Sequence, residues 1–143
     1  MDLEEQYEKI YRYCYFKIHH REIAEDITQE TFLRFFKSNY ADNGKAMQYL
    51  YTIARNMCID EYRKQKAETL KEEVIYNYSE DNIIEQISVN KASAELDETE
   101  RELLLLRYVN EVPVSVIGKL YHISRFAVYR KILQAKKNLK DKL

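Results

Sequence analysis

The residues best suited to contact a ligand lie on one face of a helix predicted over 45–66. On a helical wheel of about 100° per residue, this face combines an aromatic ring, hydrogen-bonding groups and a cation. Its members are Tyr49, Thr52, Asn56, Asp60 and Arg63. Such a set can stack on bases and bind phosphates, as contact with single-stranded nucleic acid requires. Considered alone, the helix leaves an ordinary solvated face as an equal alternative.

A second candidate surface lies on the helix predicted at the end of the chain. Residues 124–143 hold seven Lys or Arg and one acidic residue, so this segment suits a polyanion. Arg130 and Gln134 can hydrogen-bond to base edges, and Phe126 or Leu133 can contact a thymine methyl group. The alternative is a lysine-rich helix exposed for solubility. The outward aromatic and apolar residues disfavour it, because they are poorly suited to solubility. They are Phe126, Tyr129 and Leu133.

A third candidate surface is the acidic side of a helix predicted over 22–38. Its polar residues are Glu22, Glu25, Asp26, Gln29 and Glu30. Neither a nucleophile nor a pocket-forming loop accompanies these carboxylates, so the pattern does not indicate catalysis. A solvated face, or a docking face for a basic partner, is favoured.

The remaining reactive side chains do not have the spacing of a chemical site. Adjacent His19 and His20 cannot share a helix face, which disfavours a metal site. Cys14 and Cys58 are the only cysteines, and we predict buried free thiols rather than a disulfide or metal ligands. The chain also lacks a Gly-rich phosphate loop. We therefore expect no catalytic residues, no metal, no cofactor and no enzymatic activity.

The elements that position these surfaces are predicted to be all helical. Two Gly and one Pro are too few for many β-turns, and apolar residues recur at helical spacing. Residues 1–66 form the first predicted domain, with helices over 2–18, 22–38 and 45–66. The strongest turn signal, Asn43-Gly44, lies in the loop 39–44.

The predicted fold class is all-α, with two small helical domains joined by an acidic linker. Residues 67–95, the linker, hold two basic and seven acidic side chains, with one short helix expected around 80–92. Residues 96–143 form the second domain. Its helices are predicted over 96–109 with Asp97 as N-cap, over 114–121, and from the N-cap Ser124 onward. This order is typical of a helix-turn-helix.

Charge and hydropathy also bear on location. The net charge of −1 conceals segregation, because residues 97–143 hold ten basic and six acidic side chains. No run approaches the roughly 18 apolar residues of a membrane span. The acidic N-terminus, MDLEEQYEK, lacks the layout of a secretion signal. We expect a cytoplasmic protein without membrane insertion.

Three segments in this order resemble the extracytoplasmic-function type of the bacterial sigma-70 family. AEDITQETFLRFFK (24–37) is similar to the family's AEDLVQEVFLRLW, and YLYTIARNMCIDEYRK (49–64) to WLYTIARNxCIDxxRK. The stretch from LDETERELLLLRYV (96–109) to ISRFAVYRKILQAKKNL (123–139) resembles its C-terminal helix-turn-helix. The resemblance implies an alternative sigma factor that binds core RNA polymerase and directs promoter recognition and transcription initiation.

The resemblance also implies partners and residue roles. The helix over 22–38 would dock on the β′ clamp helices of the polymerase through Asp26, Gln29, Glu30 and Phe32. The helix over 45–66 would melt and read the −10 promoter element through Tyr49, Arg55, Asn56, Asp60 and Arg63. The last helix would read the −35 element through Arg125, Tyr129, Arg130, Leu133 and Gln134. The β flap and an anti-sigma factor are further implied partners, and the loop 39–46 matches the family's base-capturing loop in position.

The chain departs from the family pattern at several positions. Tyr49 replaces the usual Trp, which keeps a stacking ring of smaller area. Gly118 replaces a usual Ala, and His122 a usual Gly where positive φ is often needed. These departures leave the −35 sequence open. They also leave two alternatives, a sigma-like regulator unable to initiate alone and a helical protein-interaction adaptor.

Overall fold

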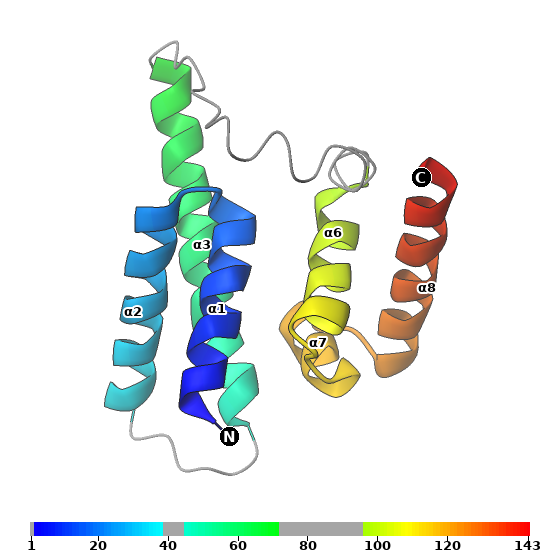
Figure 1. The fold of residues 1–143 in the computed structure, drawn as a ribbon, viewed down its shortest axis with the longest axis horizontal. Coiled ribbons are helices and arrows are strands. Elements are labelled where there is room, and N and C mark those ends of the chain that lie inside the picture. The colour runs from blue at the N-terminus through cyan, green and yellow to red at the C-terminus, as the bar shows by residue number, and fades with distance from the viewer. Residues whose placement is uncertain (1, 39–44, 72–95) are drawn as a thin grey trace. The chain divides into compact units, whose positions relative to one another are not determined.

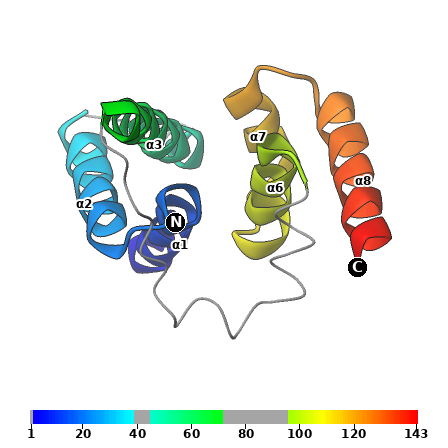
Figure 2. The ribbon, with the colours of Figure 1, turned by 90° about the horizontal axis from the view of Figure 1, so that it is seen from above.

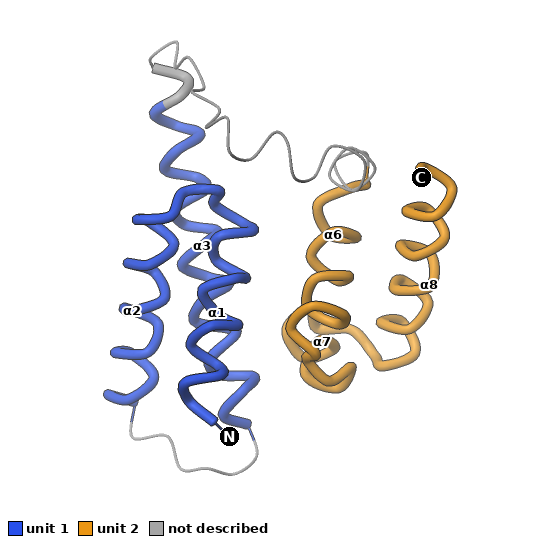
Figure 3. Tube along the Cα trace, in the orientation of Figure 1, with its two compact units in different colours: residues 1–73 blue, residues 74–143 orange. Residues whose placement is uncertain are grey.

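The computed structural model describes residues 2–38, 45–71 and 96–143, and every regular element in these ranges is helical (Figure 1). The predicted all-α fold class is therefore confirmed. The chain divides into two compact units, Met1–Glu73 and Val74–Leu143 (Figure 3).

Several predictions concern segments that the structure does not describe. The turn at 39–44, the greater part of the predicted linker and the short helix around 80–92 lie outside the described residues.

The N-terminal unit is a bundle of three helices, α1 (Leu3–Ile18), α2 (Arg21–Lys37) and α3 (Ala46–Lys71). Each of the three packs against the other two (Figure 2). The connection between α1 and α2 is short because two adjacent histidines shape it. His19 ends α1 in the left-handed region, at φ 57°, and Nδ1 of His20 caps α2 by accepting the N–H of Ile23 at 3.2 Å.

Small and aromatic side chains fill the core of this bundle. The fully buried members include Ile10, Tyr13, Cys14, Ala24, Thr28, Thr31, Leu50, Tyr51, Ala54 and Cys58. The hydroxyls of Thr28 and Thr31 donate to the carbonyls of Ala24 and Ile27, each at 2.7 Å. Each hydroxyl is thus satisfied by a carbonyl of α2 itself, so that α2 can bury this face against the other helices.

The two cysteines are buried free thiols, as predicted. A hydrogen bond with the Cys58 side chain lowers the pKa of the Cys14 thiol from its ordinary value. Burial raises that pKa, and a hydrogen bond with Thr28 lowers it. Because these three residues belong to α1, α3 and α2, the three helices meet at this point of the core.

Helix α3 continues beyond its predicted end at residue 66 and reaches Lys71. Residues 67–71, AETLK, include strong helix formers and neither Gly nor Pro, so no local signal ends the helix. Helix α3 therefore extends into the segment that was predicted as the linker.

The C-terminal unit contains α6 (Glu98–Leu104), a π-helical turn η1 (Leu105–Val109), α7 (Val114–Tyr121) and α8 (Arg125–Lys142). Asp97 caps α6 by accepting the N–H of Glu100 at 2.7 Å, and Ser124 caps α8 by accepting that of Ala127 at 3.1 Å. Both predicted N-caps are confirmed. The core of this unit is formed by residues that include Leu103, Leu106, Val112, Ile117, Val128, Ile132 and Ala135.

The predicted helix over 96–109 is not one regular α-helix. The N–H of Asn110 donates to the carbonyl of Leu105 at 2.9 Å, and the N–H of Val112 to that of Leu106 at 2.8 Å. These bonds close a wider turn than an α-helix has. The segment is helical as far as Val109, as predicted, but a helical wheel assumes a constant 3.6 residues per turn and could not show that the last part is π-helical.

The turn between α7 and α8 requires a close approach of two backbone segments. His122 lies at φ 58°, as expected for a position where the family usually has Gly. The N–H of Ile123 donates to the carbonyl of Gly118 at 2.9 Å. A Cβ atom on Gly118 would lie 2.8 Å from the Ile123 carbonyl oxygen, closer than real Cβ contacts. Glycine at 118 therefore permits this turn.

Candidate nucleic-acid interface

Helix α8 exposes apolar side chains over its first half. Phe126 is 81% exposed, Tyr129 53% and Leu133 65%. On the opposite side of the helix, Val128, Ile132 and Ala135 are buried and Leu139 is half-buried. The predicted division of this helix into an inner stripe and an outer face is thus confirmed for its buried members.

Cations surround and extend the exposed apolar residues of α8. Arg125 and Arg130 are exposed in the first half of the helix, and Lys136, Lys137 and Lys140 are exposed in the second. The ammonium group of Lys136 lies 5.3 Å from the centre of the Tyr108 ring, which η1 presents. The outer face of α8 therefore combines apolar groups with strong positive charge.

A hydrogen-bonded chain links the outer face of α8 to α6. Nε2 of Gln134 donates to Oδ1 of Asn138 at 2.9 Å. Nδ2 of Asn138 donates to both carboxylate oxygens of Glu100, at 3.0 and 3.2 Å. This chain orients Gln134 on the exposed face, where its amide can meet a base edge.

The polar face of α3 begins in contact with α2. Tyr49 is half-buried, and its ring centre lies 6.1 Å from that of Phe35. The hydroxyl of Thr52 donates to the carbonyl of Gln48 at 2.7 Å. At this end of α3, the predicted ligand-binding groups therefore also serve local packing and hydrogen bonding.

Further along α3 the same face is open. Asn56, Asp60 and Arg63 are all exposed, and Arg55 is half-buried. The structure thus brings an aromatic ring, an amide, a carboxylate and a cation onto successive turns of one helix. An extended single strand can contact such a row.

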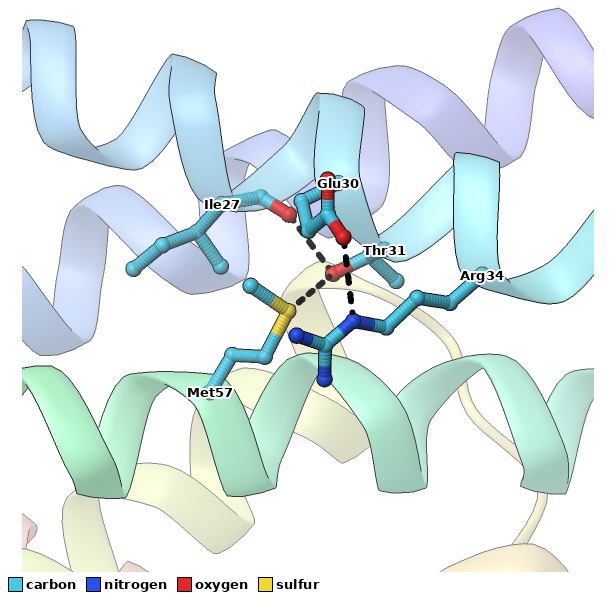
Figure 4. Close-up of polar contacts among 5 residues, drawn as sticks. All are labelled: Ile27, Glu30, Thr31, Arg34 and Met57. Carbon is cyan, nitrogen blue, oxygen red and sulfur yellow. Dashed lines mark hydrogen bonds and ion pairs between the residues drawn. The ribbon is translucent and has the colours of Figure 1, made fainter.

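The acidic face of α2 is exposed as well. Asp26 and Gln29 are exposed. Oε1 of Glu30 accepts a hydrogen bond from Nε of Arg34, at 3.1 Å (Figure 4). Figure 4 also shows Thr31, whose hydroxyl lies 3.7 Å from the sulfur of Met57 on α3. The α2–α3 contact thus lies directly beside the exposed carboxylate of Glu30.

Phe32 does not share the exposed face of α2. It is 7% exposed, and its ring centre lies 5.2 Å from that of Tyr7. The structure thus places the Phe32 ring against the core and apart from the exposed polar residues of α2.

Two exposed apolar residues beside the acidic face were not identified from the sequence. Leu33 is 51% exposed, and Phe36, which helical spacing assigns to the core side, is 58% exposed. The available signal was the seven-residue spacing from Asp26 to Leu33 and from Gln29 to Phe36, which places each pair on one side of a helix.

Helix α1 carries a row of aromatic side chains that the bundle covers only in part. Tyr7, Tyr11 and Tyr15 are only half-buried, and the rings of Tyr11 and Tyr15 stack with their centres 6.2 Å apart. The row lines a hollow of about 330 Å³ together with Glu8 and Arg12. Its four-residue spacing was visible in the sequence, but spacing alone does not show which side of a helix is covered.

Among the residues that the structure describes, no group of three or more His, Cys, Asp or Glu is arranged to hold a metal ion. None of the described helices has the length and apolar character needed to cross a membrane.

Comparison with known proteins identifies relatives of the whole chain. Residues 3–68 match the family model described as Sigma-70 region 2. The chain is 30% identical to the ECF RNA polymerase sigma factor SigW of Bacillus subtilis, over 95% of its own length and 83% of that protein. It is 27% identical to the ECF sigma factor SigM of the same species, over 92% and 86% of the two chains.

A solved structure has the same fold. The sigma factor RpoE of Bartonella quintana, in complex with the anti-sigma factor NepR, matches 95% of this chain and 90% of its own. The TM-score is 0.73 at 15% sequence identity. The matched helices include those that carry the exposed faces of α2, α3 and α8. With its similarity to SigW extending over nearly its whole length, the chain belongs to the extracytoplasmic-function sigma factors of the sigma-70 family.

Proposed function

We propose that this chain is an alternative sigma factor that binds core RNA polymerase and directs it to promoters for transcription initiation. The observation that carries the proposal is the similarity to SigW over 95% of the chain, which includes both compact units. In this role the chain acts in the cytoplasm. It is not itself an enzyme, because the polymerase supplies the chemistry of RNA synthesis.

Residues 1–66, carried by α1 to α3, would act as the unit that binds polymerase and the −10 element. The exposed polar face of α3 supports this role, since it can hold an unpaired strand. We assign Tyr49 to base stacking and the residues further along α3 to contacts with the strand. These are Arg55, Asn56, Asp60 and Arg63. From Tyr49 to Arg63 the helix rises about 21 Å, which leaves room for several nucleotides.

Residues 96–143 would act as the unit that reads the −35 element. In a helix-turn-helix, the N-terminal half of the second helix contacts base edges in the major groove. The exposed residues of α8 to which we assign these contacts are Arg125, Tyr129, Arg130, Leu133 and Gln134. The lysines of the second half would contact phosphates.

The acidic face of α2 would dock on the polymerase. Asp26, Gln29 and Glu30 are suited to a basic surface such as the β′ clamp helices, and exposed Leu33 and Phe36 would add apolar contact. We further propose that the C-terminal unit meets the β flap. An anti-sigma factor is another proposed partner, by analogy with the complex of RpoE and NepR.

Charge reversal on α2 tests the docking surface. We expect Asp26→Lys combined with Glu30→Lys to abolish binding to core polymerase and to leave the helical circular dichroism signal unchanged. The matched control is Glu8→Lys combined with Asp141→Lys, which changes the net charge equally at exposed sites on α1 and α8. Unchanged polymerase affinity in the first variant would remove these residues from the docking face.

Run-off transcription separates the proposed function from its two alternatives. The half-buried tyrosine at position 49, where the family usually has Trp, favours a sigma-like regulator that cannot initiate alone. We expect a transcript from core polymerase, this chain and a cognate promoter. Tight polymerase binding without a transcript would support the regulator instead. The helical adaptor is tested by measuring DNA affinity. An affinity that neither falls with rising salt concentration nor weakens in Arg130→Ala would support the adaptor, because phosphate contacts by cations make specific DNA binding depend on salt.

A further inference from the structure

The outer face of α8 differs from a purely phosphate-binding helix because it exposes a contiguous apolar patch. We define this patch by Phe126, Tyr129 and Leu133, which are 81%, 53% and 65% exposed. Their spacing of three and four residues places them on one stripe of the helix. An exposed stripe of this kind is unfavourable in water and marks a contact surface.

Charge around the patch indicates what covers it. Arg125 and Arg130 are exposed beside the patch, and residues 124–143 hold seven Lys or Arg against the single acid Asp141. The occupant must therefore be a polyanion that also offers apolar groups. Duplex DNA meets both requirements, because the C5-methyl group of thymine projects into its major groove.

The length of the patch sets how many base pairs it can contact. From Phe126 to Leu133 the helix rises about 10 Å, which corresponds to roughly three base steps of 3.4 Å. The patch lies in the half of α8 that begins at the N-cap Ser124. In a helix-turn-helix this half is the one inserted into the groove. The lysines of the other half then lie toward the phosphates.

We propose that α8 selects its −35 element by packing Phe126, Tyr129 and Leu133 against thymine methyl groups on about three consecutive base pairs. Arg130 and Gln134 add hydrogen bonds to neighbouring base edges. This inference rests on the proposed function, in which α8 enters the major groove of the −35 element. It adds that the preferred element contains A·T pairs opposite the patch and that their methyl groups are read directly.

Replacing thymine by uracil tests the proposal, because it removes the methyl group and leaves every hydrogen-bonding group of the base in place. Sites are first selected from a random duplex library by the holoenzyme reconstituted from core polymerase and the full chain. Each thymine of the selected −35 element is then replaced singly by deoxyuridine. We expect affinity to fall about fourfold for each contacted methyl group, the effect of burying one such group.

Variants of the patch connect the methyl effect to α8. Leu133→Ala and Phe126→Ala remove exposed side chains, so both proteins should fold normally. We expect each variant to bind the thymine site more weakly and to lose its discrimination between thymine and uracil at one position. Lys137→Ala is the matched control on the same helix. It should weaken binding to both sites equally and keep the thymine-to-uracil ratio.

The possible outcomes separate this inference from the proposed function. Sequence-specific binding with no loss on uracil substitution, or a selected element without thymine opposite the patch, overturns the inference and leaves the function intact. Absence of any −35 preference overturns both. Loss of polymerase affinity in Leu133→Ala, with the thymine-to-uracil ratio unchanged, would assign the patch to a protein partner and overturn the inference.

Discussion

At Gly118 the absence of one methyl group decides how closely the end of α7 approaches the turn that follows it. A Cβ atom there would lie 2.8 Å from the carbonyl oxygen of Ile123. We expect Gly118→Ala to lower the free energy of unfolding of the C-terminal unit by about 1–2 kcal/mol. The free-energy cost of this clash exceeds the roughly 1 kcal/mol that alanine contributes over glycine inside a helix.

Urea denaturation of the full chain, followed by amide signals of α7 and α8, measures this loss. Lys119→Ala serves as the control, because Lys119 is exposed on the same helix one residue away. A variant at 118 as stable as the control would show that the turn relaxes at little cost.

Residue-scale features were predictable where they depend on near neighbours in the sequence. The N-caps Asp97 and Ser124 were predicted because each acts on a backbone group three residues away. The different burial of Phe32 and Phe36 was missed. The two residues are four positions apart and lie at similar angles on a helical wheel, and the wheel does not show where along α2 the neighbouring helices stop covering it.

Among the elements, α3 carries the proposed melting function, and Tyr49 is its most testable residue. We expect Tyr49→Leu, which keeps apolar contact with Phe35 but removes the stacking ring, to reduce promoter melting about tenfold. A base–aromatic stack contributes roughly 1–3 kcal/mol, which is consistent with this loss. Permanganate reactivity of unpaired thymines in the −10 element measures melting.

Two controls distinguish stacking from folding at position 49. Tyr49→Phe keeps the ring and should melt the promoter like the parent chain. Binding to core polymerase should be the same in both variants, since α2 provides the proposed docking face. Equal melting by the Leu and Phe variants would contradict a stacking role for Tyr49.

The extent of the elements was only partly predictable. Apolar spacing located the helices because one face of each is buried, as in α1 and α8. The continuation of α3 to Lys71 and the wide turn of η1 were missed. The first follows from helix propensity rather than from apolar spacing. The second depends on backbone hydrogen bonds that no pattern of apolar residues records.

At the scale of the whole molecule, the structure divides into two units, each with its own core. We expect Leu106→Ala to destabilise the C-terminal unit by about 2–5 kcal/mol, the usual loss for a buried leucine, because Leu106 is fully buried. The amide protons of α1, α2 and α3 should keep their protection.

Hydrogen exchange read by mass spectrometry measures protection separately for peptides of the two units. Leu133→Ala is the control, since Leu133 is 65% exposed and its loss should change protection little. An equal loss of protection in both units of Leu106→Ala would show that they unfold as one.

The turn around Gly118 and His122 has a consequence for how substitutions at these two positions combine. The family usually has alanine at the first position and glycine at the second, and here the small residue stands at the first. Without a Cβ at 118, its carbonyl accepts the N–H groups of both His122 and Ile123. We expect the two positions to be epistatic. Glycine at 118 permits the tight turn that holds His122 in the left-handed region, whereas alanine at 118 alone would place a Cβ atom 2.8 Å from the carbonyl oxygen of Ile123.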